Sequence, residues 1–321
     1  MSLRFARLLM TGSVACSIAT SIVTSVACSI DPKHYATDAS APDGGPHGGT
    51  DGSSSTDGRP GGDASPSTRP RVAYAGDGIA HETAAVVRYE LTIDGAADFI
   101  AATKPRLALC DFFPETIETE RTKDTPVPAL DELVRTTRPE IVVLQFWGNS
   151  DNHNPCMKDG DGEILEPGTL GYYARYRADA VRATQIIRDA AAAAGGPIPT
   201  IFWVLQGPDR ELPERPMRLD DNVRAVADQS AASHTIDAGR GVSEAANPAA
   251  PGGRYEWTQW LPCNDFEIDS GHCATGSSQI HKDDKTPEFC LGKVVAGECD
   301  KWSPGVFRYG RAIAEAVRAA L

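Results

Sequence analysis

The stretch Arg71-Val-Ala-Tyr-Ala-Gly-Asp-Gly-Ile-Ala80 decides the fold. Its apolar run ends at Gly76-Asp77-Gly78 and resumes at Ile79, which predicts a buried strand, a tight turn and the start of a helix. In a parallel sheet such a turn lies at the carboxyl end of a strand, where these folds bind their ligands. A second turn of this kind, Gly148-Asn149-Ser150-Asp151, follows the β-branched run Ile141–Phe146.

These two turns, in this order, resemble those of the SGNH (GDSL) hydrolases. In that family Gly-Asp-Ser follows the first strand with Ser as the nucleophile, a later Gly-Asn helps to bind the oxyanion, and Asp-x-x-His lies near the C-terminus. The segments Pro155-Cys156-Met157 and Cys299–Tyr309 resemble a secreted, disulfide-bearing branch of the family. The resemblance spans roughly residues 71–321. It implies ester hydrolysis or O-acyl transfer on glycans or lipids, with such a ligand as the partner.

The sequence departs from the family at both catalytic positions. Gly78 stands where the family has its nucleophilic Ser, and Asp284 and Glu288 stand where it has Asp-x-x-His. The serine mechanism needs a hydroxyl and a neighbouring base, so this alignment predicts a catalytically degenerate, ligand-binding protein. By the resemblance, the N–H groups of Gly78 and Gly148 and the Asn149 side chain point into one oxyanion or ligand pocket.

Other interpretations of the same residues stay open. Ser150 is a possible substitute nucleophile and His281 a displaced base, which would make the protein an active esterase with a non-standard catalytic set. His81 lies one turn past Gly78 and is expected near the pocket. Carboxylates such as Asp77, if they converge there, could act as an acid/base or metal cluster. No metal and no cofactor is expected, and a purely structural envelope protein is a third alternative.

Apolar runs that alternate with helical stretches predict an α/β fold. We expect a three-layer α/β/α sandwich with a mainly parallel five-stranded sheet, as in flavodoxin-like folds and SGNH hydrolases. The expected strands are 72–76, 106–110, 141–146, 200–205 and 234–237. The expected helices are 79–87, 94–102, 128–136, 170–194, 219–231 and 304–320. No internal repeat is visible.

The N-terminal 70 residues have the composition of export and tether segments. Residues 1–28 carry two arginines and then an apolar run, which predicts a signal peptide. Small residues before Cys28 resemble a bacterial lipoprotein site, and plain secretion is the alternative. Residues 29–70, rich in Gly, Ser, Asp and Pro, predict a disordered linker to a domain at 71–321. We therefore expect an exported envelope protein that meets the membrane only through its lipid.

Charge and cysteine content narrow the function further. The 321-residue chain has a net charge of −13, which excludes nucleic acid as a partner. We expect a monomer. Six cysteines remain after the signal peptide, and their even number in an exported chain indicates disulfides, with fifteen possible pairings. Local spacing and the family resemblance favour the pairs Cys110 with Cys156, Cys263 with Cys273, and Cys290 with Cys299.

Overall fold

The computed structural model describes residues 68–116, 120–123, 126–147, 156–244, 255–273, 275–285 and 287–321. Its centre is a five-stranded parallel sheet in the order β2-β1-β3-β4-β5. The strands are β1 (Arg71–Gly76), β2 (Asp98–Thr103), β3 (Ile141–Gln145), β4 (Thr200–Val204) and β5 (Ser233–Ile236). This order is that of doubly wound, flavodoxin-like folds, whose ligands bind at the carboxyl ends of β1 and β3.

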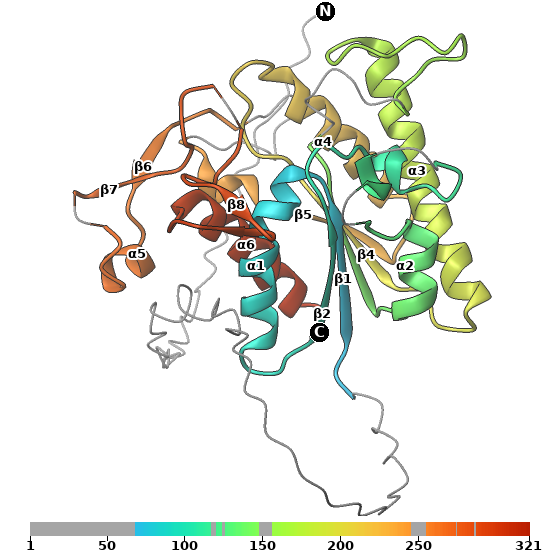
Figure 1. Cartoon of the computed structure of the whole chain (residues 1–321), viewed down its shortest axis with the longest axis horizontal. Helices are drawn as coiled ribbons and strands as arrows, with labels where there is room; N and C mark the ends of the chain where they lie inside the picture. Colours follow the sequence, from blue (N-terminus) through green and yellow to red (C-terminus); the bar gives the residue numbers. More distant parts are fainter. Residues whose placement is uncertain are drawn as a thin grey trace, which may run out of the picture. The chain divides into compact units, whose positions relative to one another are not determined.

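Helices cover both faces of the sheet, so the predicted three-layer α/β/α class is confirmed (Figure 1). They are α1 (Gly78–Thr92), α2 (Leu130–Thr137), α3 (Leu170–Ala193), α4 (Glu214–Ala227) and α6 (Pro304–Arg318). Ala73 and Ala75 of β1 pack with α2 and α3, whereas Val72 and Tyr74 pack with α1 and α6. This alternation is the period of two that a strand buried on both faces requires.

The turn after β1 depends on a glycine. A Cβ atom at Gly76 would lie 2.1 Å from the carbonyl oxygen of Gln145 and 2.4 Å from the Cβ atom of Ala80. Only glycine therefore lets β1 and α1 approach β3 this closely. The next residue, Asp77, is the N-cap of α1, and its side chain accepts a hydrogen bond from the N–H of Ile79 at 3.1 Å.

The prediction of a helix at 94–102 and a strand at 106–110 is wrong. β2 occupies Asp98–Thr103 and pairs with β1 over its whole length at the edge of the sheet. β2 contains two alanines, which have low strand propensity, so the local sequence does not predict a strand. Pairing with β1 overrides this local propensity. Residues 109–112 form a short 3₁₀ helix, and Arg106 has a left-handed φ of 65°, which no strand accommodates. The apolar run there is buried by loop packing instead.

The other predicted strands and helices are present within a few residues, with two larger differences. α1 continues to Thr92, five residues beyond the predicted end, and α4 begins at Glu214, five residues before the predicted start. At the end of α1 the chain buries Leu91, which extends the apolar face beyond the predicted boundary. Pro213 and Pro216 lie at the start of α4. The prediction began the helix after them because proline breaks a helix interior, but proline is tolerated in the first helical turn.

The region between η4 (Gly239–Val242) and α6 holds small elements that the sequence analysis treated as irregular. They are β6 (Trp260–Pro262), α5 (Asp265–Asp269), β7 (Ser277–Gln279), β8 (Val294–Val295) and β9 (Glu298–Cys299). β6 pairs with β7 and β8 with β9, each pair antiparallel. With so little regular structure, this region relies on covalent and ionic links to the rest of the fold.

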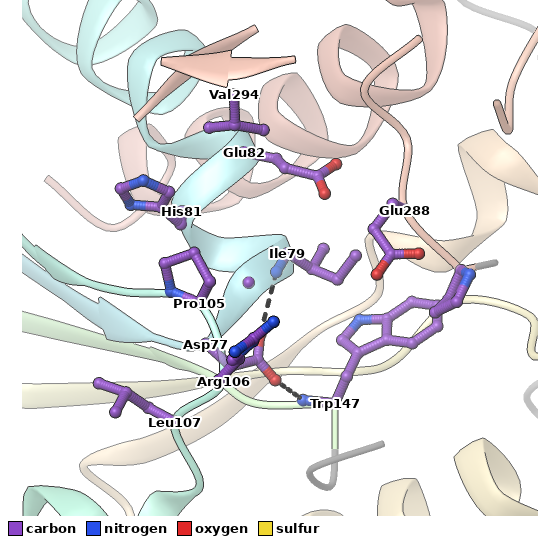
Figure 2. Close-up of a pocket in the computed structure, with 12 residues that line it drawn as sticks. Asp77, Ile79, His81, Glu82, Pro105, Arg106, Leu107, Trp147, Glu288 and Val294 are labelled. Atoms are coloured by element: carbon purple, nitrogen blue, oxygen red, sulfur yellow. Dashed lines mark hydrogen bonds between the residues drawn. The ribbon is translucent and has the colours of Figure 1, made fainter. Parts of the chain in front are cut away.

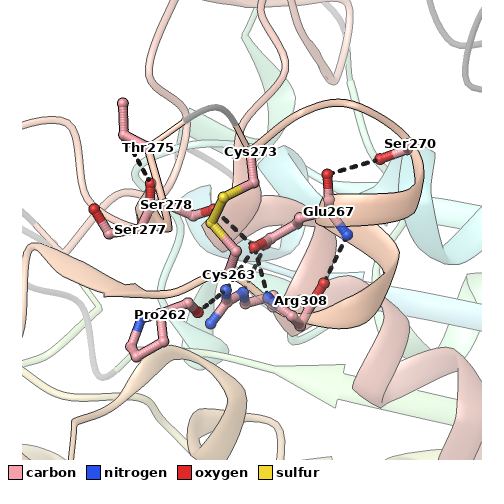
Figure 3. The surroundings of a disulfide bond; sticks show 10 residues. Pro262, Cys263, Glu267, Ser270, Cys273, Thr275, Ser277, Ser278 and Arg308 are labelled. Carbon is pink, nitrogen blue, oxygen red and sulfur yellow. Dashed lines mark hydrogen bonds and ion pairs between the residues drawn. A yellow bond between two sulfur atoms is a disulfide. The ribbon is translucent and has the colours of Figure 1, made fainter.

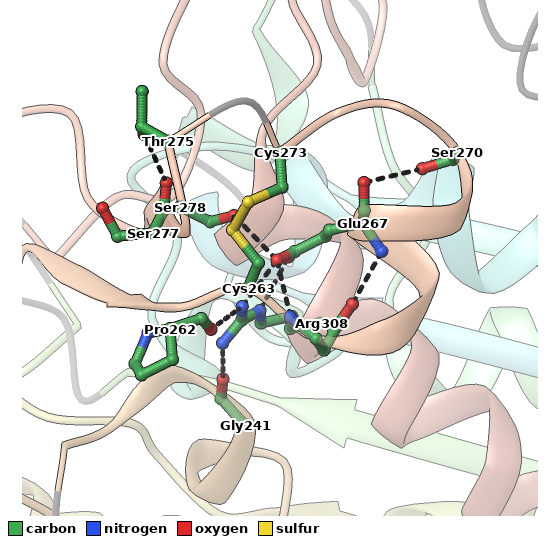
Figure 4. A network of polar contacts seen from close by, with 11 residues as sticks. Gly241, Pro262, Cys263, Glu267, Ser270, Cys273, Thr275, Ser277, Ser278 and Arg308 are labelled. Atoms are coloured by element: carbon green, nitrogen blue, oxygen red, sulfur yellow. Dashed lines mark hydrogen bonds and ion pairs between the residues drawn. A yellow bond between two sulfur atoms is a disulfide. The ribbon is translucent and has the colours of Figure 1, made fainter.

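All three predicted disulfides are present: Cys110–Cys156, Cys263–Cys273 and Cys290–Cys299. Beside the second one, the fully buried Glu267 holds α5 against α6 (Figure 3). Its carboxylate accepts hydrogen bonds from Arg308 Nε at 2.8 Å and Nη2 at 2.7 Å, and from Ser278 Oγ at 2.7 Å. Arg308 also reaches the carbonyl oxygens of Pro262 and Gly241 (Figure 4).

The predicted signal peptide, Cys28 and all but the last residues of the predicted linker lie outside the described residues. Within the described part of the chain, no helix combines the length and the apolar character needed to cross a membrane.

Candidate functional site

A pocket of about 310 Å³ lies where β1 and β3 end and α1 begins (Figure 2). This is the switch point at which flavodoxin-like folds bind ligands. Its lining combines apolar, acidic and basic side chains from the turn after β1, the loop after β2, the end of β3 and the C-terminal disulfide region. The lining residues are Asp77, Gly78, Ile79, His81, Glu82, Pro105, Arg106, Leu107, Trp147, Pro287, Glu288 and Val294.

Gly78, the first residue of α1, lines this pocket without filling it. A Cβ atom built on Gly78 would meet only the Cα atom of Pro105, at 3.9 Å, which is an ordinary contact distance. The contrast with Gly76, two residues earlier, shows that the fold itself does not demand glycine at position 78. The pocket therefore has room for the side chain that this position lacks.

Asp77 fixes the geometry of the turn that carries Gly78. Its Oδ1 atom accepts from the N–H of Ile79, and its Oδ2 atom accepts from the N–H of Trp147 at the end of β3. Burial raises the pKa of Asp77 to about 7, against the opposing effect of these N–H donors. Asp77 is thus a positioning residue that joins the carboxyl ends of β1 and β3, and its oxygens are occupied by backbone groups.

Glu82 lies one helical turn after Gly78 and joins α1 to the C-terminal disulfide region. Its Oε2 atom accepts hydrogen bonds from the N–H groups of Phe289 and Cys290, both at 2.9 Å. Burial is the main reason that its pKa rises to about 8, and the charge of Glu288 raises it further. The contact holds Glu288, the residue before Phe289, at the pocket.

The pocket also brings in Glu288 and Arg106 as exposed side chains. Glu288 is the residue predicted at the family's base position, and Arg106 comes from the loop after β2. His81 lines the same pocket, as expected, and its Nδ1 atom lies 3.2 Å from the carbonyl oxygen of Thr103. Burial lowers the pKa of His81 below its usual value, so the imidazole is neutral at pH 7.

The structure separates other predicted residues from the pocket. Asp284 is exposed and is not among the described residues that line it. His281 is fully buried, stacks on Trp257 at 3.9 Å between ring centroids, and also lies outside the lining. Burial lowers the pKa of His281 to about 4, so it is a neutral core residue. The predicted residues of the second turn, Gly148, Asn149 and Ser150, fall outside the described residues.

Sequence reasoning missed Glu82, Arg106 and Val294 as pocket residues. Glu82 carried a usable signal, because residues four apart on a helix share a face and Gly78 was already singled out. Arg106 and Val294 carried none, since they lie in a loop and a two-residue strand whose positions depend on tertiary contacts. Among the described residues, no three His, Cys, Asp or Glu side chains are grouped so as to hold a metal ion.

No family model and no curated protein matches the chain. Solved structures are similar to it at low identity. They include a carbohydrate esterase family 3 protein from Talaromyces cellulolyticus, with a TM-score of 0.34 and 12% identity over 52% of this chain and 77% of that one. The C-terminal catalytic domain of Streptococcus pneumoniae peptidoglycan O-acetyltransferase A has a TM-score of 0.35 and 11% identity over 78% and 94%. A GDSL-like lipase from Bacteroides thetaiotaomicron has a TM-score of 0.36 and 12% identity over 78% and 89%.

Proposed function

We propose that this protein is an exported ligand-binding protein with an SGNH-hydrolase-like fold, which binds an acyl-ester group on a glycan or lipid and does not hydrolyse it. One observation carries the proposal. Gly78, which the sequence resemblance aligns with the family's nucleophile, lies at a pocket with room for a side chain and has none. Glu288, which the same resemblance aligns with the family's base, lines this pocket.

The chemistry of the lining supports binding without a covalent step. Among the described residues that line the pocket, none has a hydroxyl, thiol or amine side chain. These are the groups that form acyl-enzyme intermediates in most esterases. The backbone N–H of Gly78, at the start of α1, can donate to a carbonyl oxygen, and Ile79, Leu107 and Val294 offer apolar surface to an acyl group. An ester therefore has binding partners in this pocket, and the described lining residues supply no hydroxyl, thiol or amine to attack it.

The disulfides support export as part of the proposal. Three pairs within one domain are typical of proteins that fold outside the reducing cytosol. Together with the predicted signal peptide and linker, they favour a protein of the cell envelope, either anchored through a lipid on Cys28 or secreted.

The test is the hydrolysis of p-nitrophenyl acetate and butyrate by the full chain, beside a variant with Gly78→Ser and Glu288→His. We expect an inactive parent and an active double variant, with Gly78→Ser alone as the control for the nucleophile without its base. Activity in the parent that Ser150→Ala or His281→Ala abolishes would establish the alternative, an esterase with a non-standard catalytic set. An inactive but folded double variant would show that the pocket no longer holds an ester in a reactive position.

A further inference from the structure

Two side chains of opposite charge are available at the pocket. Arg106 and Glu288 are both exposed, and both line it (Figure 2). In the described part of the chain, neither side chain forms an ion pair or a hydrogen bond, with the other or with a third residue. The pocket therefore presents one unpaired cation and one unpaired anion from two different segments.

The other titratable groups of the pocket are committed within the protein. Both carboxyl oxygens of Asp77 and the Oε2 atom of Glu82 accept hydrogen bonds from backbone N–H groups, and both side chains are buried. His81 is neutral because burial lowers its pKa, and its Nδ1 atom lies against Thr103. Among the described residues that line the pocket, Arg106 and Glu288 are therefore the exposed charged groups that a ligand would meet.

Both charged residues are held by anchored neighbours. Leu107, directly after Arg106, is buried at 1% exposure, and Phe289, directly after Glu288, is fully buried with its N–H bound to Glu82. Arg106 itself has the left-handed φ of 65°, a conformation that residues other than glycine rarely adopt. Such strain is concentrated at ligand sites, where the fold holds a side chain in a required direction.

The pocket lining also has an apolar part. Ile79, Pro105, Leu107 and Val294 contribute aliphatic surface, and the cavity of about 310 Å³ is at the small end of ligand pockets. A compact ligand that carries a short apolar group and charges of both signs fits this lining better than a long acyl chain or a neutral sugar.

We infer that the pocket binds a zwitterionic ester, whose ammonium group faces Glu288 and whose carboxylate or phosphate group faces Arg106. This inference rests on the proposed function and names the chemical class of its ligand. The same chemistry occurs in an amino-acid-bearing glycan and in the head group of a phospholipid. Arginine binds carboxylate and phosphate alike through its planar fork, so the two sources must be separated by experiment.

The experiment is a titration of the full chain, followed by NMR chemical shifts, with small probes of defined charge. O-acetyl-L-serine carries ammonium and carboxylate, and O-phosphoethanolamine carries ammonium and phosphate. Acetylcholine is an ester with only a cation, acetoxyacetate an ester with only an anion, and methyl acetate a neutral ester. We expect a zwitterion to bind at least about fivefold more tightly than either singly charged ester, as an exposed charge contact allows. Preference for O-phosphoethanolamine would indicate a lipid head group, and preference for O-acetyl-L-serine an amino-acid-bearing glycan.

Single variants test which charged group of the ligand each side chain contacts. Arg106→Gln should weaken the binding of O-acetyl-L-serine and acetoxyacetate about fivefold and leave that of acetylcholine unchanged. Glu288→Gln should weaken O-acetyl-L-serine and acetylcholine about fivefold and leave acetoxyacetate unchanged. Arg177→Gln and Glu211→Gln, exposed charges outside the pocket, are the matched controls.

Two outcomes would overturn the inference, and they differ. Equal binding of charged and neutral esters, insensitive to both variants, would overturn the zwitterion and leave an ester-binding pocket. If no ester binds, and the Gly78→Ser/Glu288→His variant is also inactive, the proposed function fails as well.

Discussion

The Oε2 atom of Glu82 accepts a hydrogen bond from the N–H of Cys290 at 2.9 Å, although 208 positions separate them in the chain. The same oxygen accepts from the N–H of Phe289. One buried carboxylate on the first helix therefore holds the segment that completes the pocket, next to the Cys290–Cys299 disulfide.

Replacing Glu82 by alanine should destabilise the fold by about 3 kcal/mol, because two buried N–H groups lose their acceptor. Glu82→Gln keeps a carbonyl oxygen in this position and should cost less than half as much. Urea unfolding without reductant measures both, with the exposed Glu211→Ala as control. Equal losses for alanine and glutamine would show that the acceptor oxygen is not what matters.

The contribution of Glu82 to stability should fall as the pH rises from about 4.5 to 8. The pKa of a glutamate in the unfolded chain is 4.5, and burial raises that of Glu82 to about 8 in the folded chain. Between these values the folded chain holds a proton that the unfolded chain has released. The stabilising contribution of Glu82 is therefore complete below pH 4.5 and is lost as the pH passes 8. Burial also raises the pKa of Asp77, from 3.8 to about 7, so its stabilising contribution is likewise lost as the pH rises through this range.

The difference in unfolding free energy between the parent and Glu82→Gln separates the effect of Glu82 from that of the other buried acids. Unfolding free energies measured across this pH range should fall more steeply for the parent than for the variant. Parallel pH profiles would contradict the raised pKa.

Gly76→Ala and Gly78→Ala should have opposite outcomes. At position 76 the new Cβ atom would lie 2.1 Å from a backbone oxygen, so we expect a loss of at least about 3 kcal/mol or failure to fold. At position 78 it meets nothing closer than 3.9 Å, and alanine should change stability by less than about 1 kcal/mol, with a gain favoured by its helix propensity. Thermal unfolding of both variants measures these changes in stability. A large loss of stability in Gly78→Ala would contradict the conclusion that the pocket has room for a side chain at position 78.

Arg308→Met should cost about 3–5 kcal/mol, because it leaves the carboxylate of Glu267 buried without its cation. Adding Glu267→Leu should recover part of that loss, since the unpaired charge is then gone while Ser278 still loses an acceptor. Arg311→Met removes an exposed pair with Glu315 on the same helix and should cost less than about 1 kcal/mol. Similar losses for Arg308→Met and Arg311→Met in urea unfolding would contradict this ranking.

Sequence reasoning located the first and third strands because their apolar runs end at glycine-containing turns, a signal that is local. It failed at β2, where the chain is rich in alanine and only pairing with β1 defines the strand. It also failed at 106–110, because the apolar residues there are buried by a loop. The buried Arg121 stabilises the neighbouring segment by donating hydrogen bonds to the carbonyl oxygens of Asp111, Thr116 and Val127. No sequence pattern predicts such contacts.

Sequence reasoning likewise located some residues of the candidate site and misplaced others. Gly78 and Glu288 were found because a resemblance pointed to their positions, and the structure brings both to one pocket. His281 was expected near it and is instead packed against Trp257 in the core. Whether a histidine faces a cavity or an aromatic ring depends on the conformation of an irregular segment, which spacing alone does not determine.

The contact between Glu82 and Cys290 also bears on how the protein folds. A contact between residues this far apart closes a long loop, and the entropic cost of that closure slows its formation relative to local helices. The sheet and α1 can assemble first, but the pocket wall must wait for the C-terminal segment and its disulfide. Binding competence should therefore lag behind secondary structure during refolding, and a ligand would select for chains that have completed their oxidation.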